Sequence, residues 1–178
     1  ISFDRAYGNF GQMPTVQHLT ADGEATFGDS QDVLGEEMGV NAYNVIGVNP
    51  DSEEIMCAWQ MTSMGPGIVT LGGQKFDFFG ERMWGEEAIA LAQKESLSGY
   101  AYGPVAIKAL SDDKWFVCYA DETGWAANQG YVGTFDADGN ESSLESIGDI
   151  CALSYPKTFF DGNDFYLIYL NELTDDDW

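Results

Sequence analysis

The sequence predicts an all-β protein, and three observations support this prediction. Residues 105–120 contain two apolar runs, VAIKAL and WFVCYA, on either side of Ser111-Asp112-Asp113-Lys114. Branched and aromatic residues that flank a polar, turn-forming tetrad are typical of two antiparallel strands. A unit of the same kind recurs at 45–60 and at 155–170. A second kind of hairpin alternates with the first and is predicted at 16–28, 68–80 and 132–144.

This alternation predicts three pseudo-repeats of paired antiparallel hairpins, at about 15–60, 68–120 and 132–170, within a single domain that covers 1–178. The alignment places Cys57, Cys118 and Ile168 at one equivalent position, and Leu19, Leu71 and Phe135 at another. Six hairpins in three repeats match the strand count of a β-trefoil, whereas propellers have four or more blades. A trefoil-like and a propeller-blade-like arrangement therefore both remain open.

Two segments outside the hairpins receive their own predictions. Residues 1–14 contain glycines and no hydrophobic period, so we expect an irregular N-terminal arm, and 173–178 form an acidic tail. Residues 86–95, EEAIALAQKE, are rich in alanine and leucine, with acids first and a lysine near the end. This composition predicts one short helix near 86–95 that ends before Gly99.

The charge is the most unusual property of the chain. The chain has 30 acidic and 7 basic residues, which give a net charge of −23 over 178 residues. So negative a surface disfavours direct binding to nucleic acid and to anionic membranes, and favours basic protein partners or divalent cations. No apolar run approaches the roughly 20 residues of a membrane-spanning helix, so no transmembrane segment is expected.

The chain begins at Ile1, and we interpret it either as a processed mature chain, extracellular or within an organelle, or as a portion of a longer protein. The three cysteines lack any CxxC spacing, so we expect small buried apolar side chains and no zinc site. A disulfide between Cys57 and Cys118 requires that their strands be neighbours. Asn140-Glu141-Ser142 is a glycosylation sequon for a secreted protein.

Residues 105–121 together with Gly130-Tyr-Val-Gly-Thr-Phe135 resemble the blade repeats of propeller-type proteins. Those blades contain an apolar strand, an "LSD-K" turn, a strand of the "F-V-V-x-Y" kind and a "G-x-x-V-G-T" strand. The resemblance is closest over 105–135 and weaker at 45–71 and 155–170. It implies a propeller-like fold and implies no particular activity.

One turn has oxygen-bearing side chains in the alternating pattern of calcium loops. Asp136, Asp138 and Asn140 are therefore candidate ligands for calcium, the one cofactor that we consider. The closing acid of an EF-hand is missing, because Ile147 occupies that position. Asp-Gly is also common in ordinary hairpin turns, so the same residues can serve the backbone alone.

Apolar side chains in the predicted loops are candidates for contact with a partner or ligand. Trp125 lies in the loop 121–130, Met61 and Met64 lie in the loop 61–67, and Tyr100 and Tyr102 share one face if their segment is extended. Exposed aromatic and methionine side chains on loops suit protein partners or stacking on a glycan.

Catalytic patterns are weak in this sequence. The pairs Glu36-Glu37 and Glu86-Glu87 could act in a glycosidase, but pairs are common in a chain with so many acids. The single histidine, His18, has no nucleophile elbow near it. We therefore predict a non-catalytic, acidic interaction module that is a peripheral or structural subunit of a larger assembly with other protein subunits. The alternatives are a carbohydrate-binding domain, for which calcium is a candidate cofactor, and a glycosidase-type enzyme.

Overall fold

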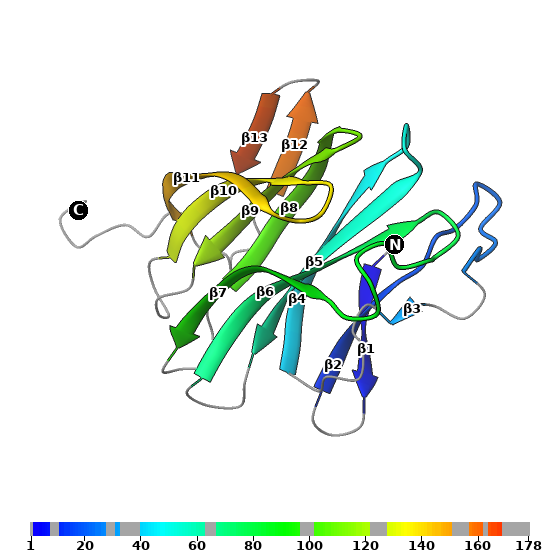
Figure 1. The fold of residues 1–178 in the computed structure, drawn as a ribbon, viewed down its shortest axis with the longest axis horizontal. Coiled ribbons are helices and arrows are strands. Elements are labelled where there is room, and N and C mark those ends of the chain that lie inside the picture. Colours follow the sequence, from blue (N-terminus) through cyan, green and yellow to red (C-terminus); the bar gives the residue numbers. More distant parts are fainter. Residues whose placement is uncertain are drawn as a thin grey trace.

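The computed structural model describes residues 2–7, 11–27, 31–32, 40–62, 67–96, 102–121, 128–150, 157–161 and 164–168. These residues form antiparallel strands joined by turns, and none of them lies in a helix (Figure 1). The prediction of an all-β protein is confirmed. Within these residues, no helix has the length and apolar character needed to cross a membrane.

The strands are arranged in four sheets. The first contains β1 (Ser2–Tyr7), β2 (Gly11–Val16) and β3 (Gln31–Asp32) in that order. The second is a four-stranded meander of β4 (Val40–Asn49), β5 (Glu54–Thr62), β6 (Gly67–Asp77) and β7 (Ile89–Ser96). The third repeats this order with β8 (Tyr102–Ser111), β9 (Lys114–Asp121), β10 (Asn128–Asp136) and β11 (Glu141–Ile150). The fourth is a hairpin of β12 (Lys157–Asp161) and β13 (Asp164–Ile168).

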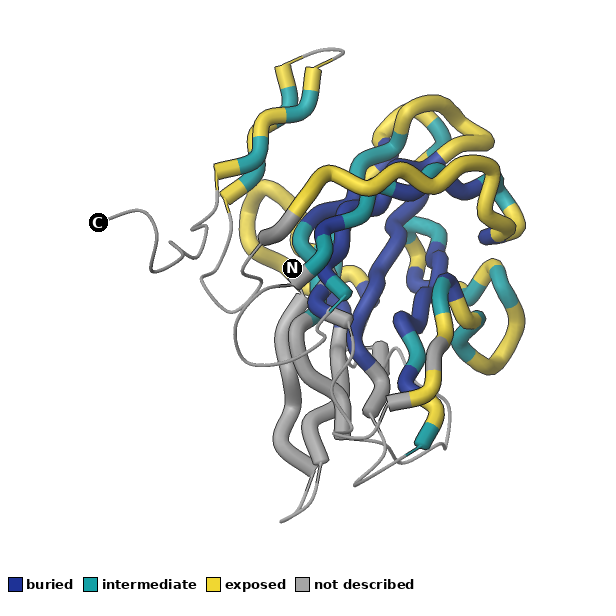
Figure 2. Tube along the Cα trace, turned by 90° about the vertical axis from the view of Figure 1, so that its left-hand side faces the viewer, coloured by how far each residue is buried: buried dark blue, intermediate teal, exposed yellow. Residues whose placement is uncertain are grey.

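Three apolar clusters join consecutive sheets, so that the sheets form a stack. Val16 and Phe27 pack against one face of β5, which contains Cys57 and Trp59. Met56, on the other face of β5, belongs to the largest cluster, which lies between β4–β7 and β8–β11. A third cluster joins β8–β11 to the β12–β13 hairpin. Figure 2 shows the buried residues along the middle of this stack and the exposed ones around it.

The predicted helix at 86–95 is wrong, because strand β7 covers most of this segment. Leu91 is buried, and its carbons lie where a side chain on Gly73 of the neighbouring strand would be. Of the two neighbours of Leu91, Ala90 is exposed and Ala92 is half-buried. Pairing with β6 and burial of Leu91 therefore outweigh the small helix preference of the alanines.

The predicted hairpin at 68–80 is also wrong. Gln74 and Lys75, which align with the turn residues Asp22 and Gly23, pair with Cys57 and Met56 inside the single strand β6. The chain turns only after Asp77, where Gly80 donates a backbone hydrogen bond to Asp77. Leu71 is therefore not equivalent to Leu19 and Phe135.

The other predicted hairpins are confirmed. Residues 45–60 form β4 and β5, 105–120 form β8 and β9, 132–144 form β10 and β11, and 155–170 contain β12 and β13. The turn at Asp22-Gly23 is present as well, beside the bridge from Leu19 to Ala25. The N-terminal arm is not irregular, because β1 and β2 pair from Ser2 with Val16 to Tyr7 with Gly11. Backbone pairing across this hairpin requires no hydrophobic period. The acidic tail 173–178 lies outside the described residues.

Candidate functional site

The β12–β13 hairpin has one covered face and one exposed face. The exposed face, here called the hairpin face, consists of Lys157, Phe159, Asp161, Asp164, Tyr166 and Ile168. Strand pairing places Phe159 beside Tyr166, with ring centroids 6.0 Å apart. Their exposed fractions are 63% and 49%, and that of Ile168 is 73%. So much exposed apolar surface on two short strands is typical of an interaction site.

The opposite face of the hairpin explains its position. Phe160, Phe165 and Leu167 pack on the cluster of Ala106, Phe116 and Cys118. The ring of Phe116 meets Phe165 at a centroid distance of 4.8 Å and Phe160 edge-on at 5.7 Å. Because side chains alternate along a strand, anchoring these rings directs the hairpin face away from the stack. Figure 2 shows this alternation at the upper left. The sequence signal was present in KTFFD and DFYLI, where apolar residues occupy both faces.

The predicted calcium ligands lie in the turn between β10 and β11, but their bonds stabilise the turn itself. Oδ1 of Asp136 accepts hydrogen bonds from the backbone N–H groups of Asp138 at 3.0 Å and Asn140 at 2.8 Å. Both carboxylate oxygens also accept from Nδ2 of Asn140. These bonds, led by that from the backbone of Asn140, lower the pKa of Asp136 below 3.8. No group of three metal-binding residues occurs within the described part of the chain.

Two other turns have the same backbone pattern. In all three turns, the backbone carbonyl oxygen of the first residue accepts a hydrogen bond from the N–H group of a glycine three residues later. The backbone N–H group of the first residue donates a hydrogen bond to the carbonyl oxygen of the fifth residue. Asp77 caps its turn as Asp136 does, because its Oδ1 accepts hydrogen bonds from the backbone N–H groups of Phe79 at 2.9 Å and Glu81 at 2.8 Å. Thr20 does so with its hydroxyl oxygen, which accepts from Glu24 at 3.1 Å. This recurrence favours a structural role for Asp136.

The predicted contact residues fall in two groups. Met61 lies on β5 and Tyr102 begins β8, so both belong to strands rather than loops. Met64, Tyr100 and Trp125 lie outside the described residues, as do Glu36 and Glu37.

The catalytic candidates are not assembled into one site. Glu86 is exposed and lies 3.7 Å from the guanidinium of Arg82, while the adjacent Glu87 is also exposed. His18 packs against the rings of Phe27 and Phe78, and its Nδ1 lies 3.2 Å from the carbonyl oxygen of Phe78. A nitrogen that donates to a backbone carbonyl in this way fixes the orientation of the ring.

Cys57 and Cys118 are free and buried, as predicted for small apolar side chains. Cys57 packs toward β2 and Cys118 packs toward the β12–β13 hairpin, so the two cysteines lie in different clusters. The disulfide between them that we considered from the sequence therefore does not form. Burial raises the pKa of each thiol to about 12, which keeps both protonated and unreactive.

Sequence reasoning missed the polar contacts that join neighbouring elements. Nε1 of Trp84 donates a 2.7 Å hydrogen bond to the carbonyl oxygen of Ala137, which links the β6–β7 connection to the next sheet. Nζ of Lys75 lies 3.1 Å from Oε1 of Glu54, and both side chains are almost fully buried. No short-range sequence signal identifies such pairs, because their partners are distant in the chain.

No protein-family model matches the chain, and no curated protein matches it significantly.

Proposed function

We propose that this chain is a non-catalytic, acidic, all-β interaction module that acts as a peripheral or structural subunit of a larger protein assembly. The hairpin face carries the proposal. Phe159, Tyr166 and Ile168 form an exposed apolar strip at one end of a stack whose other described interfaces are buried. Apolar surface of this kind is normally covered by a protein partner.

We further propose that the stacked sheets are propeller-like blades. Sheets β4–β7 and β8–β11 have the same meander order and pack face to face through one cluster. Four-stranded meanders of this kind are the building units of propellers, so this alternative has more support than the trefoil. The recurrence of the capped turn between the third and fourth strands of both sheets adds to that support.

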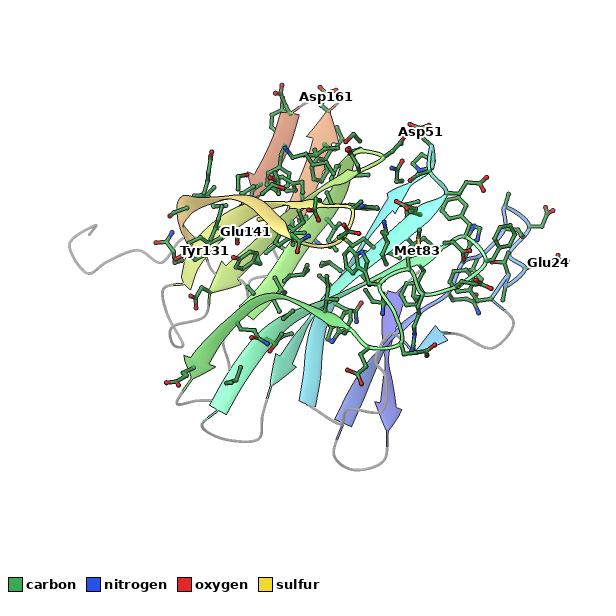
Figure 3. The ribbon with its side chains drawn as sticks, in the orientation of Figure 1. Glu24, Asp51, Met83, Tyr131, Glu141 and Asp161 are labelled. Atoms are coloured by element: carbon green, nitrogen blue, oxygen red, sulfur yellow. The ribbon has the colours of Figure 1, made fainter. Side chains whose placement is uncertain are left out.

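Acidic side chains at one end of the stack indicate what kind of partner suits that end. The turns between β4 and β5 and between β8 and β9 lie at the same end (Figure 1), and Asp51 and Asp161 project outward near that end (Figure 3). Asp112 and Asp113 are exposed there as well. In a chain with a net charge of −23, these acids favour subunits with basic surfaces and speed their association at low salt.

The mass of the native species tests this proposal. Light scattering on the protein purified under mild conditions from its own source should give a heteromeric mass well above the 19.5 kDa of the chain. Cross-linking followed by mass spectrometry should then place contacts with another chain, a second copy included, on the hairpin face. A native species that contains this chain alone would contradict the proposal. The described residues offer no observation that favours the carbohydrate-binding alternative.

A further inference from the structure

We infer that the hairpin face is a self-association surface, and that a second copy of the chain covers it around a two-fold axis perpendicular to the strands. This inference rests on the proposed function and specifies one partner.

The hairpin face continues the series of interfaces inside the stack. On the second strand of each sheet, alternate side chains point toward the following sheet. On β5 these are Met56 and Ala58, and on β9 they are Phe116 and Cys118, and all four are buried. On β13 the corresponding side chains are Tyr166 and Ile168, which are exposed. A further β-sheet with an apolar face is therefore the occupant that continues the stack.

A second copy provides such a sheet. The hairpin face is itself an apolar strip on two antiparallel strands, so two copies can pack it face to face. In an interface with two-fold symmetry the same patch serves both partners, and such dimers are the commonest oligomers.

The charges select the orientation. Lys157 lies at one end of the hairpin face, beside Ile168, and Asp161 and Asp164 lie together at the other end. An axis perpendicular to the strands places each Lys157 over the two aspartates of the other copy. An axis parallel to the strands would instead place the four aspartates together, which is unfavourable.

The area predicts weak association. Aromatic side chains bury about 150–250 Å² each, so the exposed parts of Phe159, Tyr166 and Ile168 amount to roughly 400 Å² per copy. Stable interfaces bury about 800 Å² per partner. We therefore expect weak association, with a dissociation constant on the order of 100 μM. Because two chains of charge −23 repel each other, association should strengthen as salt is added.

Sedimentation equilibrium on the full chain, from roughly 10 μM to 1 mM protein in low and in high sodium chloride, tests the inference. We expect a monomer–dimer equilibrium that Ile168→Asp weakens at least tenfold. Ile68→Asp is the matched control, because Ile68 is 64% exposed on β6 and the substitution adds the same charge. It should weaken association by less than threefold.

A charge exchange tests the orientation. Lys157→Asp should weaken the dimer, and adding Asp161→Lys and Asp164→Lys in the same chain should restore it. A monomer at every concentration and salt, or equal effects of Ile168→Asp and Ile68→Asp, would overturn the inference. Failure of self-association together with a heteromeric native mass would reject this inference and leave the proposed function intact. A native species without other subunits would reject the proposed function instead.

Discussion

Gly139 and Gly23 occupy the same position in two similar turns, and their replacement by alanine separates backbone strain from packing between sheets. Both have a positive φ, +82° at Gly139 and +85° at Gly23, in the left-handed region that favours glycine. Space for a methyl group is open at Gly23, where no atom lies within 4 Å of an added Cβ. At Gly139, an added Cβ would overlap the Ile89 side chain and lie 3.4 Å from Cζ2 of Trp84.

The expected magnitudes follow from this difference. Gly23→Ala should reduce the free energy of unfolding by about 1 kcal/mol, the cost of one non-glycine residue in the left-handed region. Gly139→Ala includes the same strain and also forces Ile89 and Trp84 to shift. Overpacking of this kind costs a further 1–3 kcal/mol, approximately, so we expect a total of about 2–4 kcal/mol.

Urea denaturation followed by tryptophan fluorescence measures both variants, and the midpoints can be compared if the slopes agree. Adding Ile89→Ala to Gly139→Ala removes the overlapping atoms, so the two substitutions together should cost less than the sum of their separate effects. Equal losses for the two glycine variants, or strict additivity with Ile89→Ala, would show that the β10–β11 turn is not packed against Ile89 as described.

Three further predictions concern buried or hydrogen-bonded groups. Lys75→Met should cost about 3 kcal/mol in urea denaturation, because it leaves Glu54 buried without its cation, and adding Glu54→Leu should recover much of the loss. A full loss in the double variant would contradict this. The turn amides lower the pKa of Asp136, so its contribution to stability is present above about pH 3.8 and is lost as the pH falls through its folded value. The deficit of Asp136→Ala relative to the unchanged chain should therefore disappear in acid, and a constant deficit would refute the role of the charge. With the third cysteine replaced by serine, Cys57 and Cys118 should not react with a disulfide reagent at roughly pH 8 until the chain is unfolded, and rapid labelling of the native protein would show that they are accessible.

Local patterns in the sequence were sufficient to predict the fold class and most hairpins. The turn at Ser111–Lys114 has strong turn residues between two apolar runs, and pairing of β8 with β9 follows from them. The segment 86–95 misled us because helix propensity is a local property, whereas the strand β7 depends on pairing with β6, about twenty residues earlier. Pairing partners of this kind are selected by tertiary packing and cannot be obtained from composition.

The candidate site was predicted less well than the fold. The sequence identifies Asp136 and Asn140 as oxygen-bearing turn residues, but their hydrogen bonds to each other appear only in the folded turn. The hairpin face was missed because Phe159 and Phe160 are adjacent and look alike in the sequence. Only the position of the neighbouring sheet determines which of the two is covered.

The wrong hairpin at 68–80 shows how the correct alignment of this segment with residues 16–28 could have been found. Oε1 of Gln17 accepts a hydrogen bond from the backbone N–H of Phe27 at 3.2 Å, and Oε1 of Gln74 accepts one from Trp84 at 3.3 Å. In both cases a buried glutamine is followed ten residues later by an aromatic residue and then by glycine, with the capped turn between them. Aligning the two segments on the glutamine places residues 16–28 against 73–85, and places Thr20 on Asp77. A buried glutamine must satisfy its amide, so the spacing from glutamine to aromatic residue is fixed by hydrogen-bond geometry. Apolar residues only need to be buried, which does not fix their spacing. The alignment of Leu19 with Leu71 was therefore wrong by five residues.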